Sequence, residues 1–404
     1  MATGSCALIA SFIDRINFTL YAYPHVIVPM ATWEVWVKSV AVFLLIVAAV
    51  VGNVLIIIIV CSSKTMRTTT NIYIANLAGA DLIIACLPTW IYLLKDVKKF
   101  WAVGWFFCKF NAFIQIQAMC ALSLIMIVIA GDRFFAVVYP LKARVTHNRV
   151  KYVLVIVWTT AIAVAVPQLV FYQYLERQWG NYLEKVCETV WPKLDMPNGE
   201  CDMGRTSQTL YYIVVLATLH WIPMVAMSIS YTIIIYRLRW GQDCSCGSEN
   251  VPIVQKRSTR KVIKLLFVLL IAFIVCAVPF QVTTLYSMTK DPVKKLPGWF
   301  QPLYYTAQSL MFAHSFINPL VYGAMSHSFR SGFRSLFTSF RNNRMWSSRK
   351  TEMKTNCTTR KAVSILSKDG PGFSQATFGT DLARSCSQIN LHVIEHLKHK
   401  QSRH

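Results

Sequence analysis

Seven long apolar stretches constrain the fold of this 404-residue chain more than any other feature. Each has the roughly 20 mainly apolar residues that a membrane-crossing helix needs. They cover residues 37–61, 71–94, 107–131, 152–172, 209–236, 262–287 and 299–323. Only 15% of the residues are charged, against about 25% in an average soluble domain, so the chain lacks the polar surface of a soluble protein. The sequence predicts an all-α membrane protein with a bundle of seven transmembrane helices.

The basic residues indicate which ends of the spans face the cytoplasm, because short cytoplasmic loops collect Lys and Arg. The segments after the first, third, fifth and seventh spans carry nearly all of the net charge of +23. We therefore expect a plasma-membrane protein with its N-terminus outside and its C-terminus in the cytoplasm. The sequon Asn17-Phe18-Thr19 agrees, and it predicts a glycan on Asn17. The basic residues lack an interleaved aromatic platform, so nucleic acid is not an expected partner.

The chain divides into four predicted parts: an N-terminal segment (1–36), the bundle (37–323), a membrane-surface helix (324–340) and a cytoplasmic tail (341–404). In the third part, apolar residues recur every three or four positions with arginines between them, as an amphipathic interfacial helix requires. These apolar residues are Phe329, Phe333, Leu336, Phe337 and Phe340. The tail is rich in Ser, Thr, Lys and Arg, and we expect it to be disordered.

Ionisable residues inside a bilayer are costly, so each needs a partner or a function. Asp81 is the one acid deep within a predicted span. It either orders the bundle as a hydrogen-bonded carboxylate or acts as a protonatable or cation-binding switch. Asp132 and Arg133 end the third span, where adjacent opposite charges can simply form an interfacial pair. Prolines such as Pro279 kink their spans by removing a backbone hydrogen bond, which suggests a bundle built to move.

Other classes of membrane protein fit the sequence less well. A transporter normally shows paired halves with broken helices, and an enzyme needs a nucleophile or metal cluster. Cys244-Ser245-Cys246 has neither a neighbouring His nor the spacing of a zinc site. We therefore expect no enzymatic activity, no metal and no cofactor.

Each span carries landmark residues, and as a set they resemble those of the rhodopsin-like G protein-coupled receptors over residues 37–340. The landmarks, in chain order, are Gly52-Asn53; Asn76-Leu77-Ala78 with Asp81; Cys108 and Asp132-Arg133-Phe134; Trp158; Pro223 with Tyr231; Phe273, Cys276 and Pro279; and Asn318-Pro319 with Tyr322. The resemblance implies a receptor that converts ligand binding outside into opening of a G protein site inside. It also implies contacts with membrane lipids, and with arrestin and receptor kinases at the tail.

The resemblance assigns roles within the switch. Arg133 would be freed on activation, Tyr231 and Tyr322 would be its partners in the open state, and Asp81 with Asn318 would form a polar hub. The remaining switch residues are Asp132, Phe273, Pro279 and Pro319. It further implies a disulfide between Cys108 and Cys187, for which Cys201 is the rival; Cys201 would otherwise pair with Cys6.

The chain departs from the family at several switch positions. Ala277 stands where the family usually has Trp, so a large indole cannot carry the switch. Thr259 replaces an acid that often faces the third-span arginine, which predicts basal activity. Leu122 and His314 stand where many members place the Ser and Asn of a sodium site, which leaves Asp81 with a poorer cation cage.

The predicted ligand is a peptide. Gln115 replaces the acid that amine receptors need, and Phe312 replaces the lysine of opsins. Gln115 and the loop around Glu188 are similar to peptide receptors of the neuropeptide Y, RFamide and orexin-like groups. The alternative is a lipid or another small molecule. The expected ligand-binding residues are Gln115, Glu188, Phe280, Gln281, Tyr304 and Gln308. Acids outnumber bases in the second outer loop, which predicts a basic residue in the peptide.

Overall fold

The computed structural model describes residues 6, 17–24, 29–139, 149–195, 201–202, 204–240, 253–289 and 297–338. Nearly all of these residues belong to one compact unit, Met1–Leu336. The expected disordered tail, Phe340, and the Cys244-Ser245-Cys246 segment lie outside the described residues, as does the side chain of Thr259. Predictions on these positions therefore stay predictions.

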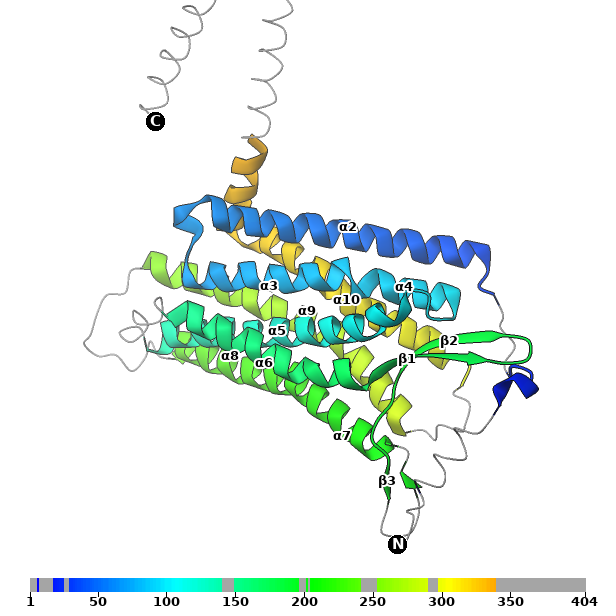
Figure 1. The fold of residues 1–404 in the computed structure, drawn as a ribbon. Helices are drawn as coiled ribbons and strands as arrows, with labels where there is room; N and C mark the ends of the chain where they lie inside the picture. The colour runs from blue at the N-terminus through cyan, green and yellow to red at the C-terminus, as the bar shows by residue number, and fades with distance from the viewer. Residues whose placement is uncertain are drawn as a thin grey trace, which may run out of the picture. The chain divides into compact units, whose positions relative to one another are not determined.

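The bundle consists of long helices that run roughly side by side (Figure 1). They are α2 (Thr32–Ser62), α3 (Thr69–Cys86), α4 (Pro88–Lys98), α5 (Gly104–Val138), α6 (Val150–Phe171), α7 (Arg205–Leu216), the π-helical turn η5 (Ala217–Trp221), α8 (Ile222–Trp240), α9 (Ile253–Thr289) and α10 (Phe300–Met325). With α3 and α4 as one span, and α7, η5 and α8 as another, these helices form the seven predicted spans.

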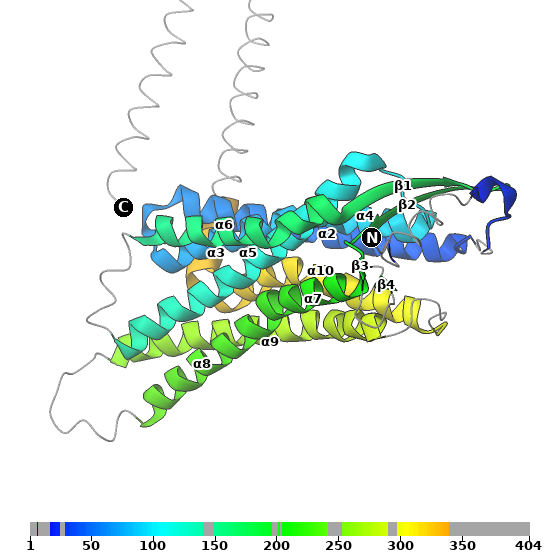
Figure 2. The same ribbon diagram turned by 60° about the horizontal axis from the view of Figure 1, so that its bottom comes forward.

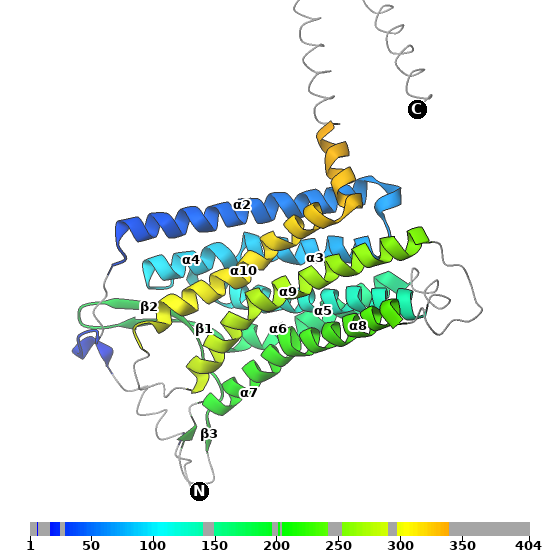
Figure 3. The same cartoon turned by 180° about the vertical axis from the view of Figure 1, so that it is seen from behind.

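Six of the described spans are long and apolar enough to cross a membrane by length and composition alone. The seventh, α10, is less apolar because it carries buried polar side chains, among them Gln308, His314, Ser315 and Asn318. It packs against α9, α2 and α3, and Figure 3 shows it beside α9. The polarity of α10 therefore faces the inside of the bundle.

Two spans are interrupted at prolines. The second span breaks at Leu87, whose φ of −124° and ψ of −70° are not helical, and a new helix begins at Pro88. The residue before a proline disfavours the α conformation, which accounts for this break. In the fifth span, the π turn just before Pro223 closes with a hydrogen bond from the Ile222 amide to the Ala217 carbonyl. Such single π turns are frequent at functional sites.

An antiparallel hairpin follows α6 in the long connection to α7. Strands β1 (Tyr172–Gln178) and β2 (Leu183–Thr189) pair from Tyr172↔Thr189 to Gln178↔Leu183. Figure 2 shows the hairpin running out past the ends of the helices. We call this end of the bundle the hairpin end and the opposite end the Arg133 end. A second pair of very short strands, β3 (Leu194–Asp195) and β4 (Cys201–Asp202), lies just before α7.

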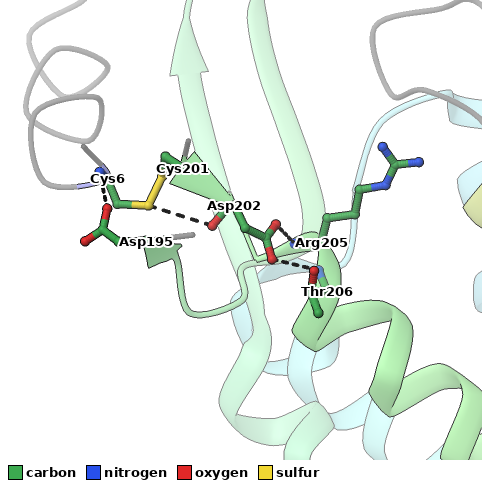
Figure 4. Close-up of a disulfide and its surroundings, with 6 residues drawn as sticks. All are labelled: Cys6, Asp195, Cys201, Asp202, Arg205 and Thr206. Carbon is green, nitrogen blue, oxygen red and sulfur yellow. Dashed lines mark hydrogen bonds between the residues drawn. A yellow bond between two sulfur atoms is a disulfide. The ribbon is translucent and has the colours of Figure 1, made fainter. Parts of the chain in front are cut away.

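Two disulfides fix the segments at the hairpin end. Cys108 of α5 is bonded to Cys187 of β2, so the predicted bridge is confirmed over its rival, Cys201. Cys201 is instead bonded to Cys6 (Figure 4). The first bridge joins the hairpin to the third span. The second ties the N-terminal segment to the strand that leads into α7.

A short helix over residues 327–338 follows α10. Phe329 on this helix is 1% exposed, and its ring lies 5.5 Å from that of Tyr322 in α10, centroid to centroid. Phe337 is 67% exposed. One side of the helix therefore packs against the bundle, while an apolar side chain stays uncovered, as in the expected amphipathic helix.

Candidate functional site

The acids of the hairpin are engaged in ion pairs across its two strands. Arg177 of β1 contacts both Glu188 and, at 3.6 Å, Glu184 of β2. Lys185 lies 3.4 Å from Glu176. Three of the acids that predicted a basic ligand are therefore partly neutralised by their neighbours. The side chain of Glu188 is still 44% exposed, so it keeps a face open to solvent.

Two further acids of the same loop hold backbone groups. Asp202 accepts hydrogen bonds from the amides of Arg205 (2.8 Å) and Thr206 (2.9 Å) at the beginning of α7, as Figure 4 shows. The amide of Thr206 is the main cause that lowers the pKa of Asp202. Asp195 accepts a hydrogen bond of 2.8 Å from the amide of Cys6. These two carboxylates therefore support the loop and the start of the fifth span.

The predicted pocket residues lie on α5, α9 and α10. The rings of Phe280 and Tyr304 lie 5.9 Å apart and join the sixth span to the seventh. Gln308, one turn from Tyr304, is 7% exposed, whereas Gln115 on α5 is half-buried. This part of the predicted site thus combines aromatic faces with amide groups, which suits a peptide's backbone.

Gln281 has a partner that the sequence did not indicate. Its side-chain oxygen accepts a hydrogen bond of 2.7 Å from the indole of Trp221 in η5, and Gln281 is only 4% exposed. The fifth and sixth spans are therefore linked by a polar contact at this level. A ligand that reaches Gln281 would act on a residue that is already hydrogen-bonded.

A small cavity lies among the second, third, fifth, sixth and seventh spans. Its volume of about 20 Å³ has room for about one water molecule. Its lining is mainly apolar, with two imidazoles and two hydroxyls: Ile84, Met119, Leu122, Ser123, His220, Phe273, Cys276, Ala277, Met311, His314 and Ser315. The predicted ligand-binding residues do not line it, whereas Phe273, one of the predicted switch residues, does.

Phe273 contacts two buried histidines beside this cavity. Its ring lies 5.7 Å from that of His220 in η5 and 5.6 Å from that of His314 in α10, centroid to centroid. Both histidines are 4% exposed. His314 was noted in the sequence, but His220 was missed. The signal that could have revealed His220 is an ionisable ring inside an apolar span, three residues before Pro223.

The polar hub forms as the resemblance implied. The Asn318 amide donates to Asp81 Oδ2 at 2.8 Å and lies 3.4 Å from His314 Nδ1. Asp81 is fully buried. Nearby, the amide of Asn53 donates to the carbonyl of Ser315 at 2.8 Å. The hub therefore joins the first, second and seventh spans through side chains with almost no exposure to solvent.

At the Arg133 end, Asp132 connects two helices. Its Oδ2 accepts hydrogen bonds from Arg133 at 2.6 Å and from the hydroxyl of Thr70 in α3 at 2.7 Å. Tyr231 and Tyr322, the expected partners of Arg133 in the open state, are buried at 3% and 1% exposure. Asp132 therefore ties the third span to the second, and Arg133 is held by its neighbour in sequence.

The sequence matches the family described as 7 transmembrane receptor (rhodopsin family) over residues 52–322. The matched region holds the hub, the Asp132–Arg133 pair and the Cys108–Cys187 bridge described above. The chain belongs to this family. It is therefore a rhodopsin-like G protein-coupled receptor and not an enzyme.

Among curated proteins, the chain is 30% identical to the substance-P receptor of Rattus norvegicus over 306 residues, which is 76% of this chain and 72% of the relative. It is 29% identical to the human substance-P receptor, over the same shares of both chains. Identity to the neuromedin-K receptor of Mus musculus is 28%, over 76% of this chain and 64% of the relative. These relatives do not support the expected likeness to the neuropeptide Y, RFamide and orexin-like groups.

Proposed function

We propose that this chain is a receptor for a neuropeptide and that substance P and neuromedin K are the first ligands to test. The observation that carries the proposal is the similarity to substance-P and neuromedin-K receptors over 76% of the chain. The mixture of aromatic and amide side chains at Phe280, Tyr304 and Gln308 supports it, because a peptide presents both amides and apolar side chains.

In this proposal, the hairpin end faces the outside of the cell. The excess of Lys and Arg on the connections at the other end supports this orientation, as do the two disulfides at the hairpin end. Asn17 is exposed at the same end and carries a glycan in the proposed orientation. Treatment with a glycosidase tests this: wild-type receptor should gain mobility on a gel, whereas Asn17→Gln should not.

At the other end, the proposed partner is a heterotrimeric G protein, which binds when Arg133 leaves Asp132 and meets Tyr231 and Tyr322. The present pairing of Arg133 with Asp132 supports its place as the holding contact. The proposal also includes membrane lipids around the bundle, and arrestin and receptor kinases at the tail. Exposed apolar side chains such as Phe43, Ile156 and Val225 on the helices support contact with lipid.

The proposed peptide carries at least one basic residue. Within the hairpin, Arg177 is shared between Glu184 and Glu188, so the acids keep a surplus of one charge there, although Lys95 of α4 also interacts with Glu188. The exposed carboxylate of Glu188 lies on the strand that is bonded through Cys187 to the third span. A local negative charge on a strongly basic protein raises the encounter rate of a cation.

A peptide screen in cells tests the function. Cells that express the receptor at the surface are given substance P, neuromedin K and a wider peptide library, with calcium and cAMP as readouts. We expect a saturable response to a peptide that untransfected cells do not show. A response to a lipid extract but to no peptide would contradict the proposal. The basic residue is then tested by replacing each Lys or Arg of the active peptide with Gln, at low and high ionic strength.

A further inference from the structure

The position that usually carries an indole is occupied here by Ala277, and three rings from three spans meet beside it. His220 comes from η5 in the fifth span, Phe273 from α9 and His314 from α10. All three rings are buried, and Phe273 contacts both imidazoles at centroid distances of 5.7 and 5.6 Å. The sixth span is therefore held on two sides at the level of Phe273, by rings from its two neighbours.

Hydrogen bonds link the same region to the predicted ligand pocket on one side and to the polar hub on the other. On one side, Trp221 follows His220 in the π turn and donates to Gln281 of the predicted ligand pocket. On the other side, His314 lies 3.4 Å from Asn318, which donates to Asp81. A shift of the π turn therefore changes the hydrogen bond to Gln281 and the ring contact with Phe273 together, because one short turn carries both contacts.

The place of Pro279 explains why Phe273 matters for movement. Pro279 lies in α9 between Gln281 and Phe273, and a proline inside a helix removes a backbone hydrogen bond and allows the two halves to bend. The half of α9 that leads to the Arg133 end begins next to Phe273. That half cannot swing outward unless the Phe273 ring leaves at least one of the two imidazoles.

We propose that His220 and His314 are positioning residues that hold Phe273, and with it the sixth span, in the arrangement seen here, in place of an indole at Ala277. The contact is made by the rings, so its strength depends on aromatic character. Loss of one buried ring contact favours the open arrangement by roughly fivefold, by the usual strength of an aromatic pair. The inference concerns the helices alone and does not depend on which peptide or G protein binds.

The test measures the position of the sixth span directly. Spin labels are placed at Tyr152→Cys and Lys264→Cys, on exposed positions of α6 and α9 near the Arg133 end. In the protein used for labelling, Ser replaces every cysteine except those of the two disulfides and the buried Cys120 and Cys276. Double electron–electron resonance on purified receptor in nanodiscs, without ligand, then reports the fraction of molecules with the longer distance.

Three variants separate ring contact from polarity. His220→Leu removes the ring, and we expect the long-distance fraction to rise roughly fivefold. His220→Phe keeps a ring, and the rise should stay below about twofold. His327→Leu is the matched control, because this histidine is exposed on the helix after α10 and does not line the cavity; it should change nothing.

His314 is tested in the same way, with one further expectation. His314→Phe keeps the ring but loses the contact with Asn318, so its long-distance fraction should lie between those of wild type and His314→Leu. The proposal is overturned if His220→Leu and His220→Phe give the same distribution, or if both match wild type. Should His220→Leu fail to fold, Phe273→Leu removes both ring contacts at once, and an unchanged distribution there overturns the proposal equally.

Discussion

Arg133 illustrates how one side chain combines a structural contact with a proposed signalling role. Its guanidinium is held by Asp132, which also accepts the hydroxyl of Thr70. A guanidinium can exchange such a carboxylate for acceptors on a partner protein, whereas an apolar side chain cannot. The pair is therefore suited to release the arginine without leaving the acid unbonded, since Thr70 keeps one hydrogen bond to Asp132.

We predict that Arg133→Ala abolishes G protein activation but leaves peptide binding intact. Loss of a charged hydrogen-bonding group should reduce nucleotide exchange at least roughly tenfold. The measurement is agonist-stimulated nucleotide exchange at matched surface expression, with peptide affinity measured on the same membranes. Thr70→Val serves as control, because it removes the second bond to Asp132 and leaves the arginine. Full signalling by Arg133→Ala would refute the role.

Two possible roles of Glu188 can be separated by exchanging its charge with that of Arg177. It either contacts the peptide or supports the hairpin through Arg177. In the first case, Glu188→Lys lowers the potency of a basic peptide, and the double variant Glu188→Lys with Arg177→Glu does not restore it. In the second case, the swap restores the pair and the potency. We expect no restoration, with a loss of roughly tenfold in both variants. Concentration–response curves of the active peptide decide between the two.

At the scale of elements, the N-terminal segment is bound to the loops at two separate places. Cys6 is bonded to Cys201. Farther along, the Tyr21 carbonyl accepts from the Gly180 amide at 2.9 Å, and the ring of Phe18 lies 4.9 Å from Trp179 at the hairpin turn. The described residues of this segment, Cys6 and those from 17 to 24, therefore belong to the folded hairpin end.

The Cys6–Cys201 bridge leads to a prediction about coupling between variants. Cys6→Ser and Cys201→Ser each lose the same bond, so each should lower the midpoint of thermal unfolding by roughly 2–4 °C. The double variant should be no less stable than either single one, because the bond can be lost only once. Thermal unfolding of purified receptor measures all three. Losses that add up in the double variant would show that the two cysteines act separately.

At the scale of the whole molecule, the first and seventh spans approach each other closely at Gly52. A Cβ added there would lie 2.6 Å from Cβ and 2.8 Å from Cγ of Pro319. Pro319 is fixed in α10 next to Asn318 and so cannot move aside easily. The absence of a side chain at Gly52 therefore sets the distance between two spans that also share the hydrogen bond from Asn53 to the Ser315 carbonyl.

We predict that Gly52→Ala destabilises the receptor by about 1–3 kcal/mol, the usual cost of overpacking. Gly79→Ala is the matched control, because a Cβ on that glycine would meet nothing within 4 Å. Surface expression and the midpoint of thermal unfolding should fall for Gly52→Ala and stay unchanged or rise slightly for Gly79→Ala. Equal behaviour of the two variants would contradict the close approach of the first and seventh spans.

Sequence reasoning located the spans because each is a local run of apolar residues. It marked Asp81 as an acid in apolar surroundings, and the resemblance to the receptor family joined Asp81 with Asn318 in a hub. It did not find the break at Leu87, although Pro88 was visible, because prolines inside membrane helices more often bend a helix than divide it. It also missed His220 and Trp221. A π turn changes which residues face the bundle, and the apolar pattern does not reveal such a change.

By itself, the sequence determined that this protein is a bundle of membrane-spanning helices and where polar residues interrupt those helices, because hydrophobicity and charge act on each segment separately. Only the tertiary structure decided which groups meet. Cys108 could pair with Cys187 or Cys201, and the fold placed Cys187 beside it and Cys6 beside Cys201. The loop acids looked free to attract a cation, yet Arg177 binds Glu184 and Glu188, and the start of α7 binds Asp202. Such pairings depend on distances between remote segments, which are set by the packing of all the spans together.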